Sequence, residues 1–546
     1  MASIELPINN RTLKYRLFEI VPGFLSWGAL VLLVILAIFQ PILCAVYLLI
    51  IFSTILLKAL GVAVHTLTGS KRVKLAEQTA WDEYLMDIEA IGKNKTIIDF
   101  DGPKNYFTDR HKKILLGLKN IQHPKPSQLY HAVIIPMYNE TFAVLDSTVK
   151  SLTESKTSPK CLIVFIAYEQ RGGAAARNVA SKLKKKYHNI FYHFDIVEHP
   201  SDIEDEVIGK GANITNAGMY LKKWVNQQAI KYSDVIVTAL DSDNRPHKQY
   251  FNHVSYEYII HPNRKRLSYQ PVSLFLNNIW DVPAPMRVVA TGNSFWNIIS
   301  VMRPHILRNF ASHAQPMDAL VEMDFWSKRT IVEDGHQYWR SYFHFKGDYS
   351  IVPVFVPIYQ DAVLSDTYIK TLKAQFVQLR RWAYGASDVP FVAIRIFSKQ
   401  RIVPFWAGFS RLVRLIDSHL TLACLPPLVA FGGWVPLFIN SEAGRSVVAN
   451  QLPEILGVVQ RFALLGLMVS IFVSFKMLPP RPARYKKIRT IGMLIQWFLM
   501  PVTALVYSSL SAYYSQTRLM LGRYMTKFDV TEKASTILAG INKKQR

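Results

Sequence analysis

Cysteine is scarce in this chain, which carries only Cys44, Cys161 and Cys424 among its 546 residues. The three lie far apart and in no ligand spacing, which argues against a disulfide framework and against a cysteine-based zinc site. Acidic residues are also few, because 39 Asp and Glu stand against 64 Lys and Arg, for a net charge of +25. The placement of this charge favours a membrane surface and anionic ligands, so we expect no nucleic-acid partner.

The chain also lacks internal repeats, long low-complexity segments and a Walker phosphate loop. The glycine-rich stretch RGGAAARN at 171–178 has no G-K-[ST] ending. The length leaves room for roughly two to four domains and an ample core.

Charge is absent altogether from residues 24–57. A membrane-spanning helix needs about 20 apolar residues, so this run is too long for one ordinary span. Because Pro41 disfavours helix at Gln40, we predict a break there and a transmembrane hairpin at 22–60, with one long tilted helix as the alternative. Basic residues flank the hairpin and are absent from its turn, which predicts that both flanks, including the segment 1–21, are cytosolic.

Apolar runs resume after residue 400 and predict a C-terminal transmembrane region over 417–513. The runs lie near 417–438, 456–475 and 491–513. The segment 396–416 mixes apolar residues with arginines, and we expect it to lie in the membrane interface. Three spans after a cytosolic domain would export the C-terminus, yet the tail 514–546 is basic. The number of spans and the side of the C-terminus therefore stay open.

Residues 75–395, between the membrane regions, alternate between strand and helix patterns, which predicts a mostly parallel sheet. Strands are expected at 131–140, 161–169, 190–199 and 235–244, and a helix at 213–225. Ligands bind such sheets at the carboxyl ends of the strands. Polar residues follow the predicted strand ends and so converge on one edge: Asn139, Glu140, Glu169, Asp241 and Asp243.

The stretch VTALDSDNRP, residues 237–246, ends an apolar strand in two carboxylates, Asp241 and Asp243. Two such charges ~4 Å apart repel by roughly 1 kcal/mol in water and about 4 kcal/mol near a protein surface. A hard cation such as Mg²⁺ or Mn²⁺ would offset this repulsion and bridge the carboxylates to a diphosphate. Asp-x-Asp alone is a weak signal, since turns are rich in aspartate.

The stretch TIVEDGHQYWR, residues 330–340, places Glu333 next to Asp334. A like-charged neighbour raises the pKa of a carboxyl group and suits it to general-base work. The alternative is an acidic start to a following helix.

The stretch QFVQLRRWAYG, residues 375–385, combines Arg380 and Arg381 with Trp382. The arginines supply permanently charged donors for phosphate oxygens, and the indole offers a face on which a sugar ring can stack. The alternative is an amphipathic helix beside the membrane, with arginine at the headgroups and tryptophan at the interface.

Taken together and in this order, IIPMYNE, DSD, VED and the Q-x-x-R-W motif at 378–382 resemble the membrane-bound members of glycosyltransferase family 2, such as cellulose, chitin and hyaluronan synthases. The resemblance covers roughly residues 125–390 and extends loosely to the tail FDVTEK at 528–533. It implies an α/β GT-A domain inserted between N- and C-terminal transmembrane helices. It also implies an inverting, metal-dependent transfer from a nucleotide-diphosphate sugar.

The resemblance further implies roles for the matching residues. Asp241 and Asp243 would hold the donor diphosphate and its Mg²⁺ or Mn²⁺, and Asp334, beside Glu333, would be the catalytic base. The other implied donor contacts are Glu169, Lys210, Gln378, Arg380 and Arg381. The implied acceptor contacts are Trp382 and, in a loop at 290–297, Gly292 and Asn293. Two departures stand out: Glu169 replaces the usual aspartate at the nucleobase, and Val332 replaces a common threonine.

Three functions are compatible with these features. The first is elongation of a polysaccharide, coupled to its export; the second is transfer of one sugar to a lipid acceptor. The third is a catalytically silent scaffold that binds sugar nucleotides or polymer. The expected partners are a nucleotide-sugar donor, a saccharide or lipid acceptor and membrane lipids, and the sequence gives no sign of a partner subunit. We expect a multi-pass plasma-membrane protein with its catalytic domain in the cytoplasm.

Overall fold

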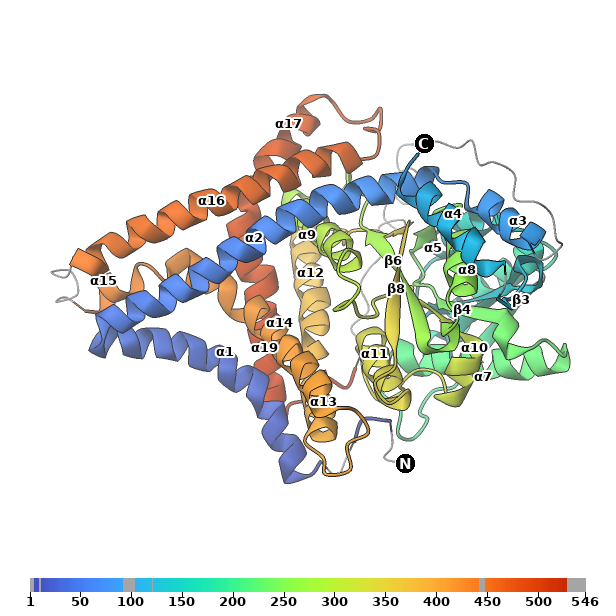
Figure 1. Ribbon diagram of the computed structural model, residues 1–546, viewed down its shortest axis with the longest axis horizontal. Helices are drawn as coiled ribbons and strands as arrows, with labels where there is room; N and C mark the ends of the chain where they lie inside the picture. Colours follow the sequence, from blue (N-terminus) through green and yellow to red (C-terminus); the bar gives the residue numbers. More distant parts are fainter. Residues whose placement is uncertain (1–3, 9–10, 92–103, 120, 441–446, 528–546) are drawn as a thin grey trace.

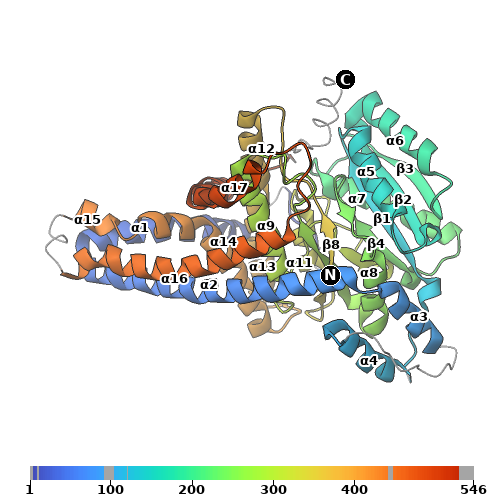
Figure 2. The same ribbon diagram turned by 90° about the horizontal axis from the view of Figure 1, so that it is seen from above.

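The computed structural model describes the chain except for residues 1–3, 9–10, 92–103, 120, 441–446 and 528–546. Long helices from both ends of the sequence project to one side of an α/β domain (Figure 1, Figure 2). The predicted motif FDVTEK, at 528–533, lies outside the described residues.

Within the described residues the α/β domain has an eight-stranded sheet in the order β3-β2-β1-β4-β7-β6-β8-β5. Its strands are β1 (Tyr130–Met137), β2 (Leu162–Glu169), β3 (His193–His199), β4 (Val235–Ala239), β5 (Arg245–Pro246), β6 (Leu267–Leu274), β7 (Ala314–Pro316) and β8 (Ser350–Tyr359). The four predicted strands are confirmed as β1 to β4, and they pair in parallel. Beyond β4 the sheet is mixed, because β6 and β8 pair in parallel, whereas β7 is antiparallel to both its neighbours and β5 is antiparallel to β8. The strands β5 and β7 are too short to show in the hydrophobic pattern.

Helices cover both faces of this sheet (Figure 2). The helices between the two apolar regions are α3 (Trp81–Ile91), α4 (Tyr106–Leu118), α5 (Phe142–Thr153), α6 (Gly173–Tyr187), α7 (Lys210–Gln227), α8 (Tyr250–Ile260), α9 (Ala284–Val301), α10 (Met317–Glu322), α11 (Glu333–His344), α12 (Tyr368–Ala383) and α13 (Asp388–Ile396), of which α12 and α13 pack against the apolar helices. Alternate residues of a strand point to opposite faces. Val133 and Ile135 of β1 therefore belong to the core cluster that includes α5 and α6, and Ala132 and Ile134 belong to the cluster that includes α7.

Five helical stretches of the described chain are long and apolar enough to cross a membrane. They are Leu13–Phe39 (α1), Pro41–Gln78 (α2), Phe405–Phe431 (α14), Gln451–Met477 within α16 (Val447–Met477), and Ile488–Met520, which contains α17 (Ile488–Ile495), α18 (Met500–Thr503) and α19 (Leu510–Met520). The predicted break is confirmed, because α1 ends at Phe39 and α2 begins at Pro41. The segment expected in the interface enters α14, which is continuous from Phe405.

The N-terminal segment is tied to the α/β domain before α1 begins. The carboxylate of Glu5 lies 2.7 Å from the guanidinium of Arg340 on α11, and it accepts a hydrogen bond of 2.7 Å from the hydroxyl of Ser327. Arg329 donates to the carbonyl of Leu6 at 3.3 Å. Arg340 is buried, so Glu5 supplies its opposite charge across a sequence separation of more than 300 residues.

The segment that follows α19 also returns to the α/β domain. Its residue Lys527 forms an isolated parallel bridge with Ile208, two positions before α7. In the same segment the hydroxyl of Tyr524 donates to the buried Glu19 of α1 at 2.9 Å. Residues from both ends of the chain therefore lie close to the loop that leads into α7.

The long helix α2 packs against α9 of the α/β domain at Gly69. A Cβ atom placed on Gly69 would lie 2.5 Å from Cγ2 of Ile298, whereas one placed on Gly28 of α1 would have no neighbour within 4 Å. The close approach of α2 to α9 therefore depends on the missing side chain.

Replacement of Gly69 by valine should weaken this contact, because overpacking costs about 1–3 kcal/mol. We expect Gly69→Val to lower the midpoint of thermal unfolding of the purified protein in detergent, and Gly28→Val to leave it nearly unchanged. Equal midpoints for the two variants would contradict the packing at Gly69.

Candidate active site

The ammonium group of Lys210 lies between three carboxylates. Its Nζ is 2.8 Å from Oδ1 of Asp241, 3.0 Å from Oδ2 of Asp334 and 3.4 Å from Oε1 of Glu333. Lys210 and Glu333 are buried, and Asp241 and Asp334 are partly exposed. The fold thus brings together four of the residues that the sequence singled out, from three separate segments.

The starts of two helices and the end of a strand build this cluster. Asp241 follows β4, Lys210 begins α7, and Glu333 begins α11. The helices meet at Gly211, where a Cβ atom would lie 2.3 Å from the carbonyl oxygen of Ser327 and 3.1 Å from Cβ of Glu333. A glycine after Lys210 is therefore required for the ammonium to reach the carboxylates of α11.

The acidic pair occupies the first turn of α11. Unpaired N–H groups and the helix dipole favour negative charge at this end of a helix. The alternative interpretation of Glu333 and Asp334, an acidic helix start, is therefore realised in the structure. The same two side chains also face Lys210, so the helix start and the candidate site coincide.

Charge is unevenly distributed over the cluster. Burial alone would lower the pKa of Lys210, but the charges of Asp241, Asp334 and Glu333 raise it well above its ordinary value, so the ammonium stays protonated. Burial and the charge of Asp334 raise the pKa of Glu333 to about 7, against the opposing effect of Lys210. Glu333 therefore exchanges its proton near neutral pH.

His313, a residue that the sequence gave no reason to choose, lies beside the base candidate. Its Nδ1 is 3.7 Å from Oδ1 of Asp334 and donates to the carbonyl oxygen of Phe310 at 2.9 Å. Its Nε2 accepts a hydrogen bond of 3.3 Å from the indole of Trp326, and burial lowers its pKa. These contacts define a neutral imidazole, which adds no positive charge to the cluster.

The turn after β4 is fixed by its own polar residues. The N–H of Asn244 donates to the carbonyl oxygen of Asp241 at 3.0 Å, and its side-chain amide donates to the hydroxyl of Ser312 at 2.5 Å. The hydroxyl of Ser242 donates to Glu140, at the end of β1, at 3.1 Å. This turn also holds Asp243, which is buried.

Asp241 and Asp243 offer the carboxylate oxygens that Mg²⁺ and Mn²⁺ prefer. The described residues contain no group of three or more His, Cys, Asp or Glu arranged for a metal ion. Asp241 and Asp243 are thus candidate ligands for a cation that would take its other ligands from a diphosphate and water. One oxygen of Asp241 is engaged by Lys210.

Glu169 ends β2 at the same edge of the sheet and is buried. Its Oε2 accepts hydrogen bonds from Arg171 at 2.8 Å and from Nδ1 of His199 at 3.1 Å. Burial alone would lower the pKa of His199, but its contacts with Glu169 and Glu206 raise it to about 9, so the imidazole is charged.

The arginines of α12 point in different directions. The guanidinium of Arg380 lies over the ring of Tyr514 on α19, 5.2 Å from its centroid, and donates to its hydroxyl at 3.4 Å. The charge of Arg381 instead acts on Glu333 and lowers its pKa, against the larger effects that raise it. Gln378 accepts a hydrogen bond from Gln375 at 3.1 Å. Arg381 is therefore close enough to Glu333 for its charge to act on the pKa of that carboxyl group.

Trp382 lies 6.2 Å from the ring of Phe275, which follows β6, and 40% of its surface is exposed. The N–H of Phe275 donates to Ser294 of α9 at 3.0 Å. The prediction of a loop at Gly292 and Asn293 is wrong, because both belong to α9. The resemblance alone implied the loop, but apolar residues at helical spacing on either side pack the segment as a helix.

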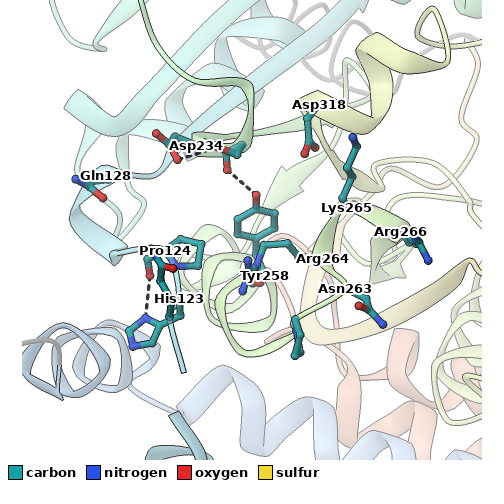
Figure 3. A pocket seen from close by; sticks show the side chains of 13 residues that line it. His123, Pro124, Gln128, Asp234, Tyr258, Asn263, Arg264, Lys265, Arg266 and Asp318 are labelled. Atoms are coloured by element: carbon teal, nitrogen blue, oxygen red, sulfur yellow. Dashed lines mark hydrogen bonds between the residues drawn. The ribbon is translucent and has the colours of Figure 1, made fainter. Parts of the chain in front are cut away.

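A cavity of about 630 Å³ lies near the start of β4, at the opposite end of that strand from Asp241 (Figure 3). Its basic side chains are already engaged: Lys265 pairs with Glu322, and Arg264 donates to the carbonyl oxygen of Tyr258 at 3.0 Å. The cavity therefore lacks the free charges that a diphosphate needs, and the candidate site remains at the carboxyl ends of the strands.

No family model and no curated protein matches the chain. Among solved structures it is similar to the mannosyltransferase PcManGT from Pyrobaculum calidifontis in complex with GDP-Man and Mn²⁺, with 13% identity, a TM-score of 0.38, and coverage of 82% of this chain and 98% of that chain. It is also similar to S. aureus TarS 1–349 in complex with UDP-GlcNAc, with 13% identity, a TM-score of 0.33, and coverage of 74% and 95%. Likenesses at these scores are too weak to define the fold, so the assignment rests on the geometry of the chain.

The raised pKa of Glu333 predicts how stability changes with pH. The folded state holds this proton more tightly than the unfolded state, so its contribution to stability is present below pH 4.5 and is lost as the pH rises to about 7. In Glu333→Gln this loss cannot occur. The quantity to compare is the thermal midpoint of the variant minus that of the unmodified protein. We expect this difference to be several degrees larger at pH 8 than at pH 5. A difference that does not change with pH would contradict the assignment.

Proposed function

We propose that this protein transfers a sugar from a nucleotide-diphosphate sugar to a growing polysaccharide at the membrane, with inversion at the anomeric carbon. The proposal takes the α/β domain as a GT-A domain of the glycosyltransferase family 2 type. The observation that carries it is the contact of Lys210 with both Asp241 and Asp334. This contact places the carboxylate assigned to the donor and the one assigned to the base at one edge of the sheet.

An inverting transfer needs a base on one side of the anomeric carbon and positive charge at the departing diphosphate on the other. Asp334, which is partly exposed, accepts the proton of the acceptor hydroxyl. Lys210 and Arg381 provide positive charge for the diphosphate. Asp241 and Asp243 would hold Mg²⁺ or Mn²⁺, which supplies further neutralisation of the leaving group when bound.

The remaining donor contacts follow from position. Glu169 offers a carboxylate oxygen for the nucleobase, and Gln378 lies one helical turn before Trp382 on α12. The exposed face of Trp382 suits stacking of an acceptor sugar. Gly292 and Asn293 directly precede Ser294, the residue of α9 that contacts the backbone of Phe275. Arg380 supports the site indirectly, through its contact with α19.

The five apolar stretches support a reaction at a membrane. We take the α/β domain to lie on the cytoplasmic side of the plasma membrane, because basic residues flank the N-terminal hairpin. The product distinguishes the possible acceptors. Purified protein incubated with labelled UDP- and GDP-sugars and Mg²⁺ or Mn²⁺ should give a polymer that does not extract into organic solvent. A single glycolipid would indicate a lipid acceptor, and the absence of any transfer would indicate a silent scaffold.

The role of Asp334 is tested by its amide variant. General-base catalysis contributes roughly 10²- to 10⁴-fold to rate, so Asp334→Asn should lower kcat for sugar transfer by about that factor. Asp366→Asn, which removes an exposed carboxylate that pairs with Lys370, is the matched control and should retain full activity. Undiminished transfer by Asp334→Asn, measured with the labelled donor, would show that another group is the base.

The two arginines of α12 should differ in their effect on donor affinity. A hydrogen bond to a charged group contributes about 1.5–3 kcal/mol, so Arg381→Ala should raise the KM for the donor by roughly ten- to a hundredfold. Arg380→Ala, whose guanidinium packs on Tyr514, should change this KM by less than about threefold. The reverse order of effects in steady-state kinetics would mean that Arg380 contacts the diphosphate.

A further inference from the structure

The ammonium of Lys210 contacts the carboxylate of Asp241, which the proposed function takes as a ligand of a divalent cation. Its Nζ lies 2.8 Å from Oδ1 of Asp241, a distance typical of a charge-assisted hydrogen bond. Both oxygens of Asp334 hold the same ammonium, at 3.0 Å and 3.2 Å, and Glu333 adds a third carboxylate at 3.4 Å. One ammonium therefore pairs with Asp241, the proposed ligand of the cation, and with Asp334, the proposed base.

This arrangement fixes the backbone that carries the ammonium, so the ammonium can move only by rotation of its own side chain. Lys210 is buried, and the backbone next to it is fixed because Gly211 packs against Ser327. His313, beside Asp334, is neutral, so it cannot replace the ammonium as a counter-charge. A second cation at Asp241 would have to lie within a few ångströms of Nζ and would be repelled by it.

We propose that Lys210 excludes the divalent cation from Asp241 until the donor arrives. Lys210 breaks its ion pair with Asp241 only when the donor binds, because the negative charge of the diphosphate then offers the ammonium another partner. The same movement frees Asp334 from its ion pair, so the base becomes available only when a donor is present. This inference rests on the proposed function, because it takes Asp241 as a ligand of the cation.

Binding of Mn²⁺ to the purified full-length protein in detergent tests the proposal without a transfer assay. The electron paramagnetic resonance signal of free Mn²⁺ gives the affinity, first without nucleotide and then with UDP or GDP. The unmodified protein should bind Mn²⁺ weakly alone and at least tenfold more tightly with the nucleoside diphosphate.

Variants of Lys210 separate its charge from its shape. Lys210→Met should bind Mn²⁺ roughly tenfold or more tightly without nucleotide, because the competing charge is gone and three carboxylates remain. Lys210→Arg should bind as weakly as the unmodified protein. The matched control is Lys184→Met, which breaks an ion pair of 2.6 Å with Asp195 elsewhere on the domain and should change nothing.

Mn²⁺ should also raise the thermal midpoint of Lys210→Met without nucleotide, since a ligand that binds only the folded state stabilises it. If the methionine variant does not fold, Lys210→Gln, which keeps an N–H donor of similar length, allows the same comparison. Equal affinity of the methionine or glutamine variant and the unmodified protein without nucleotide would overturn the role of Lys210.

A separate result tests the assumption beneath the proposal. Asp241→Asn should lose Mn²⁺ binding with nucleoside diphosphate present. If Asp241→Asn still binds Mn²⁺ with nucleoside diphosphate, Asp241 is not a ligand of the cation. Both the proposed metal site and the inference about Lys210 are then wrong. If Asp241→Asn loses binding while Lys210→Met gains none, the inference alone fails.

Discussion

A single ammonium group balances three carboxylates in the candidate site, and the rest of the arrangement depends on this balance. A buried charge is strongly destabilising unless it is paired. The carboxylates of Asp241, Glu333 and Asp334 remain close together because Lys210 lies between them. The excess of negative charge also prepares the site for a further positive partner, and the raised pKa of Glu333 relieves part of that excess near neutral pH.

The fold serves this balance by bringing three chain segments to one edge of the sheet. Parallel pairing of β1, β2 and β4 aligns their carboxyl ends, and Gly211 lets α7 approach α11 closely. The helix α12 adds Arg381 from the side of the apolar helices, while Arg380 anchors α12 to α19. The candidate site and the apolar helices thus share one structural element, α12.

Much of this could be predicted from the sequence where the pattern is regular. The first four strands, the break at Pro41 and the gathering of Lys210 and Asp241 with the VED pair follow from hydrophobic periodicity and from the resemblance. The short antiparallel strands carry too few residues for a pattern. The helical state of Gly292, the neutral His313 and the different directions of Arg380 and Arg381 depend on contacts between distant segments, which no local signal encodes.

The bridge between Ile208 and Lys527 has a consequence for biogenesis. Lys527 is synthesised after the five apolar stretches of the described chain, whereas Ile208 is synthesised long before those that follow residue 400. The loop into α7 therefore gains this neighbour only after translation has passed all of those stretches. Completion of the α/β domain would in this way wait for synthesis of the apolar helices.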